Sequence, residues 1–190
     1  MIKENKGCFQ KGNIPWNKGL GTEQVKCKTC DKKFLVPRYR RLVDNRGKFC
    51  SWKCRWNHKY KLAKEIKITP DIAELIGIII GDGCVNKANK KFSSYRIFIS
   101  GNPIEDKPYM DYYLPKLIKK CLNKNVKPFL ASNGAYLIQF SDEPFRIFLF
   151  SLGIKPNKTR IVRIPDKIKK NQLHLRMCIP ELLPNLLQKI

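Results

Sequence analysis

Hydrophobic residues between positions 69 and 100 first follow a helical pattern and then a strand pattern. Thr69 can cap a helix, Pro70 suits the first helical position, and Asp71 suits the positive end of the helix dipole. The apolar run Ile72–Ile80 then predicts a helix that stops at Gly81-Asp82-Gly83. Residues 84–100 predict two strands, because the segment 95–99 is rich in β-branched and aromatic residues.

A second helix–strand–strand–helix series follows the first. Residues 107–122 predict a helix with Tyr109, Tyr113, Leu117 and Cys121 on one side. Residues 127–141 predict a hairpin in which Asn133-Gly134 forms a type I′ turn. Residues 143–152 predict a helix closed by Gly153. The order helix, two strands, helix, two strands, helix predicts an α+β domain. Its four-stranded antiparallel sheet carries helices on one face and is open on the other.

Alternation along two of these strands divides their side chains between the two faces. Tyr95, Ile97 and Ile99 should face the helices, and Arg96 should face outward. The later strand places Tyr136, Ile138 and Phe140 inward and Gln139 outward. Arg and Gln make bidentate contacts to guanine and adenine edges, so Arg96 and Gln139 are candidate readers of DNA bases. Further candidate DNA contacts lie on or after the first strand of the pair: Asn86, Lys87, Lys90 and Lys91, of which the last two are expected to contact phosphates.

The net charge of the chain indicates the kind of molecule that it binds. The chain has 39 Lys and Arg against 15 Asp and Glu, a formal net charge of +24. An excess of this size repels itself in a compact fold and favours a polyanionic partner, with nucleic acid ahead of a membrane surface. A ribosomal-type RNA-binding protein is a competing interpretation. The sequence has no apolar run long enough to span a membrane and no signal peptide. We therefore expect an intracellular protein, cytoplasmic, nucleoid-associated or organellar, rather than a secreted one.

Four of the eight cysteines are spaced like metal ligands. The pattern Cys27-x2-Cys30-x19-Cys50-x3-Cys54 predicts a tetrahedral zinc site in which a metal replaces a hydrophobic core, with Phe34 and Phe49 packed around it. The competing interpretations are four unrelated cysteines or a redox dithiol. His58 is a possible substitute ligand, although a surface histidine is the simpler interpretation.

The region around these cysteines is basic and predicts a DNA-binding arm. The first 66 residues hold 18 Lys and Arg but 5 Asp and Glu. We expect a basic leader at 1–24, a zinc finger at 25–58 and a linker at 59–68. The finger resembles small treble-clef-like fingers of intron and phage endonucleases, and residues 9–19 resemble a short element of the same enzymes. The DNA-binding candidates here are Trp16, Lys18, Arg38, Arg40 and Arg41.

The segment from Leu75 to Gly83 combines two glycines with a terminal carboxylate. Gly77 and Gly81 lie four residues apart, so they share one helix face where another helix could approach closely. Asp82 follows at the C-terminal end of the helix, where a carboxylate is electrostatically disfavoured and a cation would offset it. The simpler interpretation is a buried helix followed by a turn.

This nonapeptide resembles the signature of the LAGLIDADG homing endonucleases, and the resemblance extends over residues 69–176. Matching segments include residues 69–71, 152–156, 162–165 and 173–176. The resemblance implies an αββαββα repeat with a saddle-shaped sheet, encoded by an intron, intein or phage mobile element. It implies metal-dependent hydrolysis of phosphodiester bonds in double-stranded DNA. Asp82 and the carbonyl of Gly81 would hold Mg²⁺.

The same resemblance implies further roles for the loop after the last predicted helix and for the motif helix. Lys158 is the candidate lysine near the attacking water, and Lys155 is the second candidate and a DNA contact. Simple phosphate contacts are the alternative role for both lysines. The Gly77 and Gly81 face would pair with a second motif helix.

The sequence departs from the family because it contains one motif. Two explanations remain open. The active form is a homodimer through the 72–82 helix, or the chain is a truncated copy of a two-repeat enzyme with a non-native tail at 177–190. A catalytically inactive DNA-binding protein, either a regulator or an intron-splicing partner, is the alternative function.

Overall fold

A computed structural model describes residues 18–40, 47–86, 95–156 and 163–179 of the chain. The chain divides into two compact units, Met1–His58 and Lys59–Ile190. No helix in the described part of the chain is long and apolar enough to cross a membrane.

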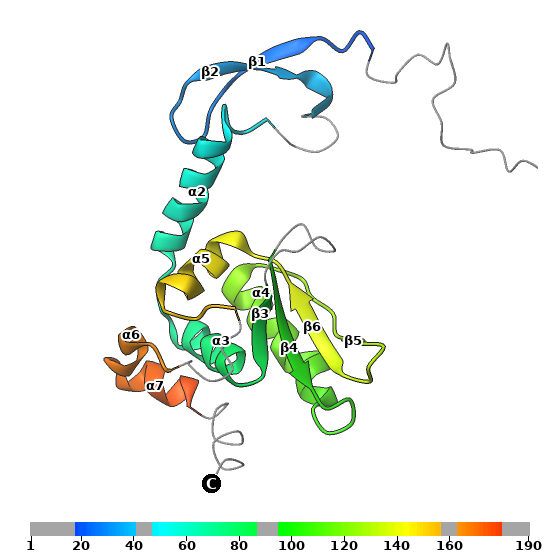
Figure 1. Ribbon diagram of the computed structural model, residues 1–190, viewed down its shortest axis with the longest axis vertical. Helices are drawn as coiled ribbons and strands as arrows, with labels where there is room; N and C mark the ends of the chain where they lie inside the picture. Colours follow the sequence, from blue (N-terminus) through cyan, green and yellow to red (C-terminus); the bar gives the residue numbers. More distant parts are fainter. Residues whose placement is uncertain (1–17, 41–46, 87–94, 157–162, 180–190) are drawn as a thin grey trace, which may run out of the picture. The chain divides into compact units, whose positions relative to one another are not determined.

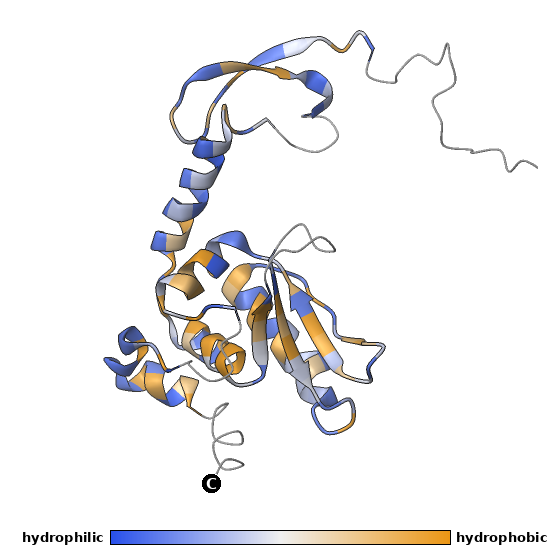
Figure 2. Ribbon diagram, viewed as in Figure 1, coloured by the Kyte–Doolittle hydropathy of each residue, from blue (hydrophilic) through white to orange (hydrophobic). Residues whose placement is uncertain are grey.

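The first unit is a β-hairpin followed by the start of a helix (Figure 1). Strands β1 (Thr22–Lys26) and β2 (Lys33–Pro37) pair antiparallel, and Asp31 turns the chain between them with a positive φ of 56°. Helix α2 (Trp52–Glu65) begins just after Cys50. It continues through most of the segment expected to be a linker. Its residues are mostly hydrophilic, as Figure 2 shows, and Ala63 is its one buried residue.

The second unit is an α+β domain with the predicted order of elements. Its four-stranded antiparallel sheet has the order β3-β4-β6-β5, and helices cover one face (Figure 1). The elements are α3 (Pro70–Gly81), β3 (Gly83–Asn86), β4 (Arg96–Gly101), η1 (Tyr109–Tyr113), α4 (Leu114–Leu122), β5 (Phe129–Leu130), β6 (Tyr136–Phe140), α5 (Glu143–Ser151), α6 (Asp166–Lys169) and α7 (Gln172–Cys178).

The predicted alternation along the strands is confirmed. Ile97 and Ile99 of β4 and Ile138 of β6 are almost completely buried against the helices. Arg96 and Gln139 are partly exposed on the other face. The register pairs Phe98 with Gln139, so Arg96 is the diagonal neighbour of Gln139 across the two strands.

Helix α3 begins as the sequence predicts. Thr69 is its N-cap, and its hydroxyl oxygen accepts a hydrogen bond from the backbone N–H of Ile72 at 3.3 Å. Loss of such a cap typically costs about 1 kcal/mol. Every residue from Ile72 to Ile79 is buried, including Glu74. The helix is therefore surrounded by protein on more sides than an amphipathic surface helix, which is why its apolar residues run continuously.

The helix predicted over 107–122 is present, but the face that it buries differs from the one the sequence pattern predicted. It opens with the π-helical turn η1, in which the N–H of Leu114 donates to the carbonyl of Tyr109, five residues back. The wider turn rotates the side chains that follow. As a result Met110 and Leu114 enter the core, whereas Tyr113 is 45% exposed.

The turn between β5 and β6 also differs from the predicted type I′ turn. Gly134 has a positive φ of 82°, and among the described residues Asn133 is not one of the non-glycine residues with positive φ. The N–H of Gly134 donates to Ala131, and the N–H of Ala131 donates to Ala135. This is a three-residue loop in which a left-handed glycine follows a type I-like turn.

Helices α6 and α7 were not predicted. Asn171 caps α7 by accepting hydrogen bonds from the backbone N–H groups of Leu173 and His174. Cys178, at the end of α7, is completely buried against α3. The segment expected to begin a tail at 177 therefore belongs, at its start, to the core of the domain.

Candidate metal centre and nucleic-acid face

The four predicted zinc ligands come together in the first unit. The sulfur atoms of Cys27, Cys30, Cys50 and Cys54 all lie within 4.8 Å of one another. The Cys30–Cys50, Cys50–Cys54 and Cys54–Cys30 sulfur distances are each 3.6 Å. Tetrahedral zinc with Zn–S bonds of about 2.3 Å requires sulfurs roughly 3.8 Å apart. The donor set therefore fits a tetrahedral metal ion.

Local backbone structure brings the two cysteine pairs together. The turn after β1 carries Cys27 and Cys30, and the N–H of Asp31 closes it on the carbonyl of Cys27 at 3.0 Å. The start of α2 carries Cys54, whose backbone N–H donates to the Ser51 hydroxyl. The Thr29 hydroxyl donates to the carbonyl of Cys54 at 2.8 Å and joins the two segments.

The surroundings of the four thiols shift the pKa values of individual cysteines in opposite directions. Burial raises the pKa of Cys27, but backbone N–H groups, that of Cys50 first, outweigh burial and hold it at about 6. The neighbouring sulfurs of Cys30 and Cys54 raise the pKa of Cys50 to about 12. Negative charge is therefore stabilised at one sulfur and opposed at another, and a central metal cation would relieve that opposition.

His58 does not belong to this cluster. Its ring packs at a tilt against Phe49, with the ring centroids 5.2 Å apart. The four-cysteine group is the metal-binding cluster found among the described residues.

Asp82 lies at the junction of α3 and β3. Its backbone N–H ends the helix by donating to Ile78 at 2.9 Å. Its backbone carbonyl accepts two hydrogen bonds from Ser100 of β4, at 3.2 Å from the N–H and 3.0 Å from the hydroxyl. Asp82 itself is exposed. No sequence pattern pointed to Ser100, because a serine in a strand is compatible with many roles.

The open face of the sheet carries polar side chains at the other end of β3 from this junction. The guanidinium of Arg96 donates to the side-chain oxygen of Gln139 at 3.1 Å, so the two candidate base readers are in contact. Asn86 pairs with Arg96 across β3 and β4. Asn86, Arg96 and Gln139 therefore form one row across three strands, which we call the polar row.

The remaining predicted site residues fall into two groups. The described ones, all exposed, are Lys18, Arg38, Arg40 and Lys155. The ones outside the described residues are Trp16, Arg41, Lys87, Lys90, Lys91 and Lys158.

The Gly77 face corrects the expected dimer interface. A Cβ atom placed on Gly77 would lie 2.4 Å from the carbonyl oxygen of Cys178. Helix α7 of the same chain therefore occupies the Gly77 notch, where the resemblance implied a second motif helix. A homodimer through the 72–82 helix would need a different part of that helix.

Comparisons with known proteins give little further guidance. No protein-family model matches the chain, and no curated protein matches it. Among solved structures, the chain is similar to a doubly substituted I-DmoI in complex with its nicked target DNA in the presence of manganese. The identity is 19% and the TM-score is 0.37. The match covers 59% of this chain and 60% of that one. At these values the likeness indicates no shared activity.

The fold and the cysteine cluster together define a class. The chain is an α+β protein with a four-stranded antiparallel sheet and a four-cysteine cluster beside its N-terminal hairpin.

Proposed function

We propose that this chain binds double-stranded DNA on the open face of its sheet and hydrolyses phosphodiester bonds there, as a homing endonuclease does. The finger would add DNA contacts, and zinc in the four-cysteine cluster would be structural. The observation that carries the proposal is the exposed carboxylate of Asp82 at the start of β3, the strand whose other end places Asn86 opposite Arg96 in the polar row.

The Ser100 hydrogen bonds support a fixed position for Asp82. A residue used to place a metal ion must be held within a fraction of an ångström of its working position. Two hydrogen bonds to the Asp82 backbone carbonyl restrain the chain next to the carboxylate.

The donor set at Asp82 suits a hard divalent cation. Mg²⁺ is commonly held by one or two carboxylates together with substrate phosphates, which matches a single exposed carboxylate at the edge of the proposed DNA-binding face. When bound there, such an ion would activate water and stabilise charge on the leaving oxygen. The protein's own contribution is to hold Asp82 in place and to align the duplex through the polar row.

Net charge supports the choice of partner. An excess of 24 positive charges favours association with a polyanion, and phosphate neutralisation contributes most of the non-specific affinity for DNA. Base-edge contacts from Arg96 and Gln139 would add sequence preference.

One observation favours a second candidate function, DNA binding without cleavage. Helix α7 fills the Gly77 notch, so a twin motif helix with its own carboxylate has no place on that face. A protein with this arrangement could serve as a DNA-binding regulator or as an intron-splicing partner.

Binding and cleavage assays on duplex DNA from the flanks of the gene would separate these functions. The endonuclease proposal expects Mg²⁺-dependent cutting that Asp82→Asn abolishes while duplex affinity is retained. The control is Asp166→Asn, which removes a carboxylate that is 87% exposed in α6. Cutting that survives Asp82→Asn would refute the metal role of Asp82. Tight binding without cutting would favour the second function.

A further inference from the structure

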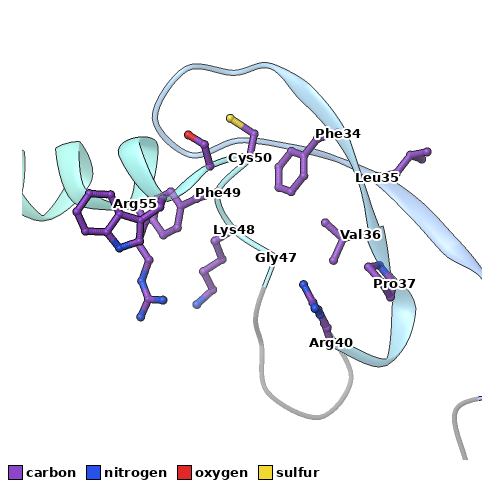
Figure 3. Close-up of a pocket in the computed structure, with 12 residues that line it drawn as sticks. Phe34, Leu35, Val36, Pro37, Arg40, Gly47, Lys48, Phe49, Cys50 and Arg55 are labelled. Carbon is purple, nitrogen blue, oxygen red and sulfur yellow. The ribbon is translucent and has the colours of Figure 1, made fainter. Parts of the chain in front are cut away.

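A groove in the first unit lies beside the cysteine cluster and has no role in the function proposed so far. It has a volume of about 970 Å³ and runs between β2 and the segment from Gly47 to Arg55. Figure 3 shows Lys48 and Arg55 on one side of this groove, and Arg40 with Val36 and Phe34 on the other. We infer that this groove binds an unpaired nucleotide of a nucleic-acid strand. The inference deepens the proposed function and rests on it.

Charge in the groove favours an anion. Arg40, Lys48 and Arg55 all line it, and none of its lining residues in the described part of the chain is acidic. All three side chains are exposed. Three like charges around one opening repel each other, and a phosphate group would relieve that repulsion while accepting charge-assisted hydrogen bonds from a guanidinium group.

An exposed aromatic ring provides the second half of the site. Trp52 also lines the groove and is 72% exposed, although its side chain is large and apolar. The Trp52 ring stacks on Trp56, with centroids 5.3 Å apart and an angle of 10° between the planes. Stacking on Trp56 restrains the Trp52 ring, and a restrained exposed indole is a platform on which a base can stack.

This combination fits an unpaired strand better than a duplex. Proteins that bind single strands combine basic grooves with aromatic side chains that stack on the bases, whereas the bases of a duplex are stacked on each other. Phosphate contacts alone would need the cations but not an exposed tryptophan. Leu35, which is 67% exposed, extends the apolar wall on the β2 side of the groove.

The cysteine cluster fixes the shape of the groove. Cys50 lines it, and Trp52 lies between the two cluster residues Cys50 and Cys54. Gly47 closes one side with a positive φ of 83°, and a Cβ there would lie 2.5 Å from a Val36 methyl group. Binding in the groove should therefore require the metal-loaded finger.

Fluorescence and affinity measurements on the full zinc-loaded chain would test this inference. The probes are a labelled oligothymidylate, which is unpaired, and a labelled duplex of mixed sequence. We expect Trp52→Ala to weaken oligothymidylate binding roughly 5- to 100-fold, the range that loss of one stacked base implies. Duplex binding should change less than about threefold.

A matched pair of charge variants separates the groove from general charge. Arg55→Ala should weaken oligothymidylate binding and reduce its salt dependence by about 0.7 in the logarithmic slope. Lys53→Ala removes the same charge two residues away, from a residue that does not line the groove. It should reduce oligothymidylate affinity less than Arg55→Ala does. Equal losses in the two variants would overturn the inference.

A direct spectroscopic measurement covers the case in which Trp52→Ala disturbs the finger. The chain has three tryptophans, so a Trp16→Phe/Trp56→Phe variant with normal zinc content reports on Trp52 alone. Oligothymidylate should quench its emission, whereas an unchanged emission at saturating probe would reject base stacking. Failure of the proposed sheet function would be seen separately, as duplex binding that does not depend on Arg96.

Discussion

The backbone of Cys178 lies where a side chain on Gly77 would have to be. A Cβ on Gly77 would be 2.4 Å from the Cys178 carbonyl oxygen and 3.0 Å from its Cα. The close approach of α7 to α3 is therefore possible because position 77 is glycine. The glycine serves packing within the chain.

Gly77→Ala should destabilise the second unit. Alanine normally stabilises a helix interior by about 0.5–1 kcal/mol relative to glycine. Here the added methyl group must push the backbone of α7 away from α3, and overpacking of this kind costs about 1–3 kcal/mol. Chemical denaturation of the variant should show a net loss of stability. A gain equal to the helix propensity would mean that α7 does not pack on Gly77 in solution.

Tyr113→Phe should lower the stability of the second unit, because it removes a hydrogen-bond donor from the buried Glu74 carboxylate. Glu74 is 7% exposed, and the Tyr113 hydroxyl donates to its carboxylate at 2.5 Å. Loss of the donor leaves part of a buried carboxylate without a partner, which costs about 1–3 kcal/mol. Tyr112→Phe is the matched control, because Tyr112 is 69% exposed. Similar unfolding midpoints for both variants would contradict this role for Tyr113.

Asp111 should contribute stability that depends on pH. The hydrogen bond from Lys107 first, and then that from Tyr136, lowers the pKa of the Asp111 carboxyl despite its partial burial. A lowered pKa in the folded state gives stability that is complete above the unfolded pKa of about 4. That stability is lost as the pH falls through the folded pKa.

Stability curves measured against pH would check this assignment. The advantage of the wild-type chain over Asp111→Asn should be full at neutral pH and should shrink in acid. Asp166→Asn, at a carboxylate that is 87% exposed, should show little difference at any pH. A stability advantage of the wild-type chain over Asp111→Asn that grew as the pH fell would contradict the lowered pKa of Asp111.

Cys50→Ser should abolish zinc binding. The Cys50 sulfur is 3.6 Å from those of both Cys30 and Cys54, so its loss removes one of the four ligands. We expect one zinc ion per wild-type chain and a large loss in the variant, measured by elemental analysis after dialysis. Cys84→Ser, at an exposed cysteine of β3 outside the cluster, should keep its zinc. Retention of zinc in Cys50→Ser would exclude a four-thiolate site.

Arg96→Ala should reduce both affinity and sequence preference for duplex DNA. A bidentate base contact is worth about 1–3 kcal/mol of discrimination, and Gln139 would also lose the partner that orients it at 3.1 Å. Competition binding against sites changed at one base pair would measure the preference. Lys155→Ala, at an exposed lysine outside the polar row, should weaken all duplexes about equally. The same uniform loss in Arg96→Ala would reduce Arg96 to a phosphate contact.

Local sequence signals were sufficient wherever neighbouring residues decide the structure. Thr69 caps α3, and alternation placed Ile97 and Ile99 inward and Arg96 outward. The cysteine spacing predicted a four-sulfur cluster because a metal site leaves a direct pattern in the chain. Each of these features depends on residues a few positions apart or on a single chemical requirement.

Tertiary structure alone decided what contacts these elements. The pattern of apolar residues could not reveal the π-helical turn that moves Tyr113 outward, because one wider turn shifts every later side chain. It could not show that Ser100 holds the backbone of Asp82, or that Trp52 lies on a basic groove. It showed that Gly77 permits a close neighbour, but the identity of that neighbour, α7, depends on contacts between residues about a hundred positions apart. Such contacts are determined by how the whole chain packs.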